Sequence, residues 1–147
     1  MRRKHQVVIS AGLLTIVALV VSLSLGAVPV LADFTDWTYS AELEVENNAT
    51  TSLPAGYVVE LAFDTTSLIG GGQMQADCDD LRVSFDNGVT EVELDRVVEG
   101  CDTASTAVRF RTQAQIATGG TDLRYRLYYG NAAAANPSDS ELAAQSL

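Results

Sequence analysis

Short segments in which apolar and polar residues alternate set the strongest limit on the fold of this chain. Between Thr38 and Asn47 every second position is apolar: Tyr39, Ala41, Leu43 and Val45. A period of two is typical of a half-buried strand. Further strands are expected over 57–63, 81–85, 91–98, 107–112 and 122–129, and Asn87-Gly88 fits a tight hairpin because both residues tolerate positive φ. Six or seven short strands at this spacing predict a single all-β domain, an antiparallel, jelly-roll-like β-sandwich.

The first 32 residues have the layout of a cleavable signal peptide. Met1–His5 is basic, Val7–Leu25 is apolar, and Val30-Leu31-Ala32 ends in a small residue suited to cleavage. Cleavage after Ala32 would leave the sandwich domain over 33–136 and a polar tail or linker over 137–147. The alternative is an uncleaved membrane anchor, since an apolar run of about 20 residues can span a bilayer. Both interpretations predict an extracellular or cell-surface domain.

Charge is divided unevenly between this leader and the rest of the chain. The whole chain has nine Lys and Arg residues against 19 acids, a net charge of −10. Its lysine and its histidine lie within the first five residues, so the part after Ala32 has six arginines and nineteen acids, a net charge of −13. That part lacks the residues for a Ser-His-Asp triad, a His-ligated zinc site, a Schiff base or a P-loop. Its negative charge also predicts no binding to nucleic acid, whose phosphates it would repel.

Cys78 and Cys101 are the only two cysteines of the chain. In an oxidising compartment an isolated pair predicts a disulfide. A metal or redox pair is the weaker alternative, because their separation of 23 positions matches no redox motif and two thiolates do not complete a zinc site.

Three short stretches of the domain are familiar in combination: Trp37-Thr38-Tyr39, Asp79-Asp80-Leu81-Arg82 and Leu127-Tyr128-Tyr129-Gly130-Asn131. Together they resemble the uncharacterised extracellular domain family numbered 2341 among the domains of unknown function (DUF2341). The resemblance covers about 34–136. It implies a β-sandwich module of prokaryotic surface and secreted proteins, often beside lectin-like jelly-roll domains, and it brings no known activity or catalytic residue.

A group of carboxylates on both sides of the third expected strand, 81–85, suggests a calcium site formed by Asp77, Asp79, Asp80 and Asp86. Outside the cell such carboxylates can supply the six to eight oxygen ligands of Ca²⁺. The spacing is not that of an EF-hand, because Leu81 and Arg82 stand where a ligand and a glycine are required. The simpler interpretation, and the one we expect, is that Asp80 pairs with an arginine and braces the start of the strand. The other acids are then solvated and the domain has no cofactor, with calcium as the alternative.

Asp64 is the one residue whose sequence context partly matches a known catalytic motif. Asp-Thr-Gly after an apolar strand is the aspartic-protease signature, but Thr66 replaces the glycine here. We therefore expect Asp64 to cap a turn through the local backbone. A glycosidase would need two carboxylates at a defined separation, and no pair stands out. The expectation is a protein without enzymatic activity, with an acid-based hydrolase as a remote alternative.

Alternation places Tyr128 opposite the apolar face of Leu123, Tyr125, Leu127 and Tyr129. Tyr128 is therefore the aromatic residue expected to be exposed, beside Arg124 and Arg126, and these three form the candidate ligand-binding group. Asn48-Ala49-Thr50 adds a glycosylation sequon in an expected loop.

These features predict a secreted or surface-displayed interaction module whose partners are glycans or proteins of the cell envelope. The alternative is a structural role, in which the domain assembles with itself or serves a larger surface protein by pairing of sheet edges. Contact with a membrane is expected only through an uncleaved leader.

Overall fold

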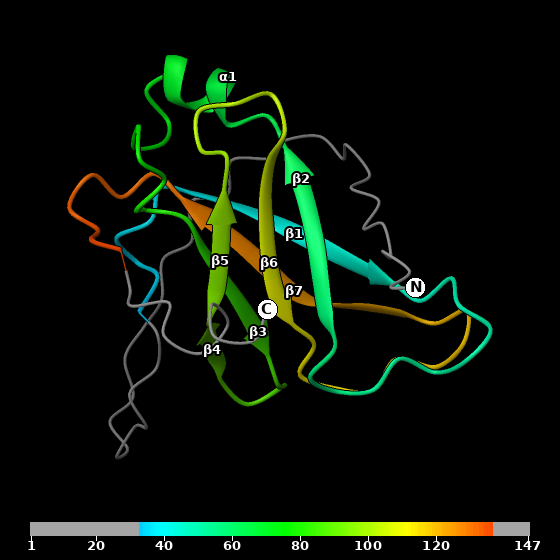
Figure 1. Ribbon diagram of the computed structural model, residues 1–147. Coiled ribbons are helices and arrows are strands. Elements are labelled where there is room, and N and C mark those ends of the chain that lie inside the picture. Colours follow the sequence, from blue (N-terminus) through cyan, green and yellow to red (C-terminus); the bar gives the residue numbers. More distant parts are fainter. Residues whose placement is uncertain (1–32, 137–147) are drawn as a thin grey trace, which may run out of the picture.

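The computed structural model describes residues 33–136, so the leader and the tail lie outside the described residues (Figure 1). The described part consists mainly of strands, with one short helix. The elements are β1 (Tyr39–Glu46), β2 (Val58–Phe63), α1 (Thr65–Gly70), β3 (Arg82–Asp86), β4 (Glu91–Leu94), β5 (Arg96–Glu99), β6 (Thr106–Arg111) and β7 (Thr121–Tyr129). Within these residues no helix is long and apolar enough to cross a membrane. The expected all-β fold is confirmed.

The strands form two antiparallel sheets, with the order β1-β7-β3-β4 in one and β2-β6-β5 in the other. Figure 1 shows β1 and β7 crossing the direction of β2 and β6 in the second layer. Apolar residues from both sheets meet between the layers, and the rings of Phe110 and Tyr125 lie 5.4 Å apart across that interface. The domain is therefore a β-sandwich with one core, as the alternating pattern predicts.

The segment expected as one strand over 91–98 is divided between the two sheets. β4 pairs with β3 and β5 pairs with β6, and the exposed residue Asp95 links them. Leu94 and Arg96 on either side of it are both buried. The chain thus passes from one layer to the other at Asp95, where a single alternating strand would have kept both neighbours in the same sheet.

A β-bulge in β7 changes which of its residues face the core. Tyr125 pairs with Leu43 and Asp122 pairs with Val45, so Leu123 and Arg124 together oppose the single residue Glu44. The extra residue reverses the alternation on one side of the bulge. Asp122 is buried at 5% exposure and Leu123 is 65% exposed. The expectation that Leu123 belongs to the core face is therefore wrong.

Candidate functional site

The predicted disulfide between Cys78 and Cys101 is present, with the two Cα atoms 6.0 Å apart. It links the loop before β3 to the loop between β5 and β6, and these strands belong to different sheets. The bond therefore ties the two layers together at the end of the sandwich that carries α1.

Asp80 organises the same end through its buried carboxylate. One oxygen accepts a hydrogen bond from the backbone N–H of Gln75 at 3.1 Å, and the other accepts one from Gly130 at 2.7 Å. Its carbonyl accepts a hydrogen bond from the indole N–H of Trp37 at 2.5 Å. The salt bridge of Arg82 is made with Glu93 instead, at 2.9 Å. The expected pairing of Asp80 with an arginine is thus replaced by bonds to the backbone.

Gly130 allows this arrangement because it has no side chain. Its φ is +88°, and a Cβ atom there would lie 2.5 Å from the ring of Tyr39 and 3.1 Å from the carbonyl of Gln73. Only glycine fits both the backbone conformation and the space. The glycine of the closing Leu-Tyr-Tyr-Gly-Asn stretch therefore has a structural explanation.

Arg82 connects both ends of the described chain. Its guanidinium carbon lies 5.2 Å from the centroid of the Trp37 ring, a cation–π contact near the first described residues. Its Nη2 donates to the carbonyl of Ala135 at 2.7 Å, near the last described residues. The three stretches that carry the family resemblance thus meet around one buried arginine and one buried carboxylate.

Tyr128 is buried, which corrects the expectation that it is exposed. It is 9% exposed, and the Phe34 ring stacks on it with centroids 4.2 Å apart and planes 3° apart. Its hydroxyl donates to Glu91 at 2.9 Å. Burial, and next the hydrogen bond to the Glu91 carboxylate, raise the pKa of Tyr128 to about 12. Sequence reasoning missed Phe34, because its position outside any strand gave no signal of where it packs.

The candidate group of Tyr128, Arg124 and Arg126 does not form one surface. Arg126 lies beside the Tyr128 hydroxyl and 3.5 Å from Glu42, whereas Arg124 is held by Asp122. With Tyr128 covered by Phe34, only the two arginines, each about half exposed, remain accessible to a ligand.

The four candidate calcium ligands are not brought together. Asp80 is buried in the bonds described above, and Asp77 accepts the backbone N–H of Asp79. Asp86 accepts the N–H of Gly88 in the turn between β3 and β4. Among residues 33–136 no group of three or more acidic, histidine or cysteine side chains could hold a metal ion.

Asp64 and Asn48 occupy the exposed positions expected of them. The Asp64 carboxylate caps α1, accepting the N–H of Ser67 at 3.1 Å and its hydroxyl at 2.6 Å. These bonds lower the pKa of Asp64. Asn48 is exposed in the loop after β1, where its amide is accessible to modification.

The bulge in β7 places an exposed apolar side chain next to an exposed arginine, and we call this surface the bulge site. It consists of Leu123, Arg124 and the adjoining depression of about 420 Å³, which is lined by Gln115, Ile116, Ala117, Gly120, Thr121 and Asp122. Full burial of a leucine side chain stabilises a fold by about 2 kcal/mol, and the bulge forgoes that contribution at Leu123. The site therefore costs stability that a regular strand would retain.

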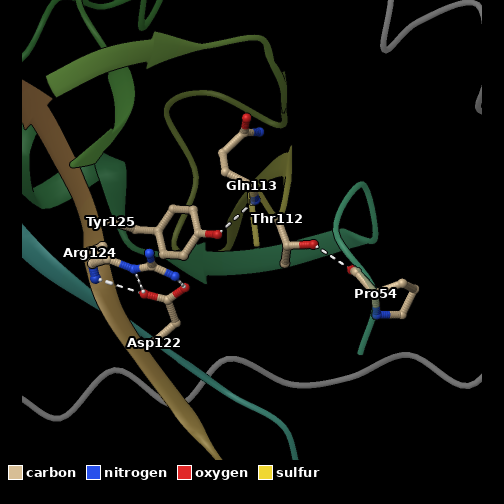
Figure 2. A network of polar contacts seen from close by, with 6 residues as sticks. All are labelled: Pro54, Thr112, Gln113, Asp122, Arg124 and Tyr125. Carbon is tan, nitrogen blue, oxygen red and sulfur yellow. Dashed lines mark hydrogen bonds and ion pairs between the residues drawn. The ribbon is translucent and has the colours of Figure 1, made fainter. Parts of the chain in front are cut away.

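Asp122 holds Arg124 in one orientation at this site (Figure 2). The Nε and Nη2 atoms of Arg124 donate to the two carboxylate oxygens at 2.9 Å and 2.7 Å. Burial acts to raise the pKa of Asp122, but the hydrogen bonds and positive charge of Arg124 outweigh it and the pKa is lowered. The guanidinium also lies 4.7 Å over the Phe85 ring. The arginine is thus fixed while its side chain remains 47% exposed.

The loops beside the bulge site are held by further hydrogen bonds. The backbone N–H of Gln113 donates to the Tyr125 hydroxyl at 2.9 Å, and the Thr112 hydroxyl donates to the carbonyl of Pro54 at 2.9 Å (Figure 2). The buried side chain of Asn47 donates to the carbonyls of Ile116 and Ala117. Because the loops are fixed to the sheets, the depression exists before any ligand binds.

Comparison with known proteins adds no assignment. The chain matches no protein-family model, no curated protein and no solved structure. What the domain does is therefore inferred from its own residues.

Proposed function

We propose that this domain is a non-enzymatic interaction module of an exported or surface-displayed protein, and that it binds other proteins of the cell envelope. The observation that carries the proposal is the bulge site, where an exposed leucine and a fixed arginine border a preformed depression. Apolar side chains and arginines at the centre of a contact contribute most of the binding energy between proteins.

The exposed apolar residues favour a protein partner over a glycan. Across residues 33–136 the large hydrophobic side chains that stand exposed are aliphatic, namely Val58, Val89 and Leu123. Stacking on a sugar needs the open face of an aromatic ring. Trp37 is half-buried against Arg82, and Tyr128 is covered by Phe34.

Export is supported by the leader and by the disulfide. A structural disulfide persists in an oxidising compartment, which agrees with the signal peptide expected over 1–32. Membership of the family that the sequence resembles would place the domain on prokaryotic surface or secreted proteins. Mass spectrometry of the protein secreted by a host that expresses the whole chain tests the leader, because cleavage after Ala32 gives a product that begins at Asp33.

Self-association is a second candidate function, and the edge strand β2 favours it. β2 is six residues long and pairs with β6 on one side. It carries one charged residue, Glu60, which forms an ion pair with Arg109 at 2.7 Å; Arg109 also pairs with Glu99 of β5. The edge strand β1, in contrast, presents three glutamates, a charge pattern that opposes edge pairing. An uncharged edge can pair with a strand of another molecule.

Three measurements on the secreted protein separate these functions. We expect a random-peptide phage library to yield specific ligands, and a glycan array to stay blank both with and without EDTA. Binding to the array would contradict the protein-binding function, and loss of that binding in EDTA would reveal a cation-dependent lectin. Light scattering that reports larger particles at higher concentration would support self-association through β2.

A further inference from the structure

We propose that the bulge site binds a peptide segment of the partner that carries one large apolar side chain flanked by lysine or arginine. This inference rests on the proposed protein-binding function and names the surface and the chemistry of the partner. The described surface offers three kinds of group at this place: an exposed aliphatic side chain, a fixed guanidinium and nearby carboxylates.

Leu123 supplies the apolar contact. It is 65% exposed, because the bulge turns it away from the core and next to the depression. Bulges commonly re-aim a side chain next to a functional surface. An apolar side chain of a partner that enters the depression would cover Leu123 and remove both from water.

Arg124 supplies a directional polar contact. Asp122 accepts from its Nε and Nη2 atoms, so Nη1 remains to donate to a peptide carbonyl. Because the ion pair and the Phe85 ring already fix the guanidinium, little side-chain freedom is lost when a ligand binds.

Carboxylates around the bulge site favour a partner segment of positive charge. Glu44 lies opposite the bulge, and Glu46 lies opposite Thr121, which lines the depression. Asp86, at the end of β3, acts electrostatically on Arg124. Residues 33–136 contain six arginines and seventeen acids, a net charge of −11. A peptide with basic flanks is therefore attracted and an acidic one repelled.

The bulge site also lies away from the segments that continue beyond the described chain. Phe34 and Ala135, close to residues 33 and 136, contact Tyr128 and Arg82 at the far end of β7. The bulge occupies the opposite end of that strand, at Leu123 and Arg124. Residues near the two ends of the described chain therefore lie at the opposite end of β7 from this surface.

The test uses synthetic peptides chosen from the phage library and the secreted protein. We expect the selected peptides to combine a large apolar residue with lysine or arginine, and Leu123→Ser to raise their Kd by about tenfold or more, a typical effect of truncating a central contact residue. Val58→Ser is the control for peptide binding, because it removes an exposed aliphatic side chain from the outer face of the other sheet. Since Val58 belongs to β2, light scattering must show that this variant has the oligomeric state of the wild type. Leu123→Met, which keeps an apolar side chain, should retain binding.

Two readouts keep this inference distinct from the proposed function. Peptides that bind Leu123→Ser and wild type equally well, or that are rich in acidic residues, would overturn the bulge site and leave protein binding in place. A library that yields no ligand would overturn both. Since Leu123 lies outside the core, Leu123→Ser should melt at the wild-type temperature, so that a loss of binding reports on the surface.

Discussion

The disulfide between Cys78 and Cys101 should contribute a large part of the stability of this domain. The bond closes a loop of 23 positions between two sheets. In the loop-entropy account, a closed loop of this size destabilises the unfolded chain by about 3 kcal/mol. For a domain of about 100 residues, each kcal/mol corresponds to roughly 4–8 °C in Tm. We therefore expect Cys78→Ala/Cys101→Ala to melt at least about 12 °C below the wild type.

Circular dichroism during heating measures this difference, with and without a thiol reductant. The reduced wild type should melt near the double variant, because both lack the bond. The double variant should show no response to the reductant, which controls for other effects of the reagent. Mass spectrometry must show that the wild type has gained two hydrogens under the reducing condition.

A small difference in Tm would contradict this prediction. If the fully reduced protein melts within about 3 °C of the oxidised one, the loop entropy is not a major part of the stability. Hydrogen bonds would then hold both loops in place: the one from Gln75 to Asp80 in the loop at 71–81, and those from the hydroxyls of Thr103 and Thr106 to the carbonyl of Gly100 in the other.

Three further outcomes are expected from buried polar groups. Asp80→Ala removes the acceptor of two backbone N–H groups and should lower the free energy of unfolding in urea by at least about 2 kcal/mol, whereas Asp79→Ala should change it by less than about 0.5 kcal/mol. Tyr128→Phe should remove the contribution of this residue to the tyrosinate absorbance change near pH 12. Because the pKa of Tyr128 is higher in the folded state, the stability of the wild type should fall as the pH rises from the unfolded-state pKa of 10.0 toward 12, and the stability of the variant should fall less. The pKa of Asp122 is lower in the folded state, so this carboxylate stabilises the fold above its unfolded-state pKa of 3.8, and that stabilisation is lost as the pH falls below 3.8. In Asp122→Asn the free energy of unfolding should therefore depend less on pH in the acid range.

The sequence predicts features that depend on local pattern or on counting. The alternation from Tyr39 to Val45 is regular, so the strand and its buried face follow directly. The pairing of Cys78 with Cys101 follows from their being the only two cysteines. Both inferences need no knowledge of which strands are neighbours.

Features that depend on strand neighbours were not predictable in the same way. A bulge is visible only when β7 is set against β1, and the alternation of 121–129 alone gave the wrong face for Leu123. Arg82 pairs with Glu93 because β3 and β4 are adjacent in the sheet.

The residues that carry the family resemblance contact one another at one end of the sandwich, and the residues proposed for binding lie at the other end of β7. Trp37, Asp80 and Gly130 are joined by hydrogen bonds at one end of the sandwich, and Arg82 packs beneath the indole. Groups that satisfy one another in this way have little capacity left for a ligand. A protein can therefore share all three stretches and still differ at the bulge, where one inserted residue decides whether position 123 is in the core or on the surface. Under the proposed function, two proteins that share the three stretches should differ in the peptides they bind where residues 121–124 or 115–117 differ, and should keep the contacts of Asp80 and Arg82.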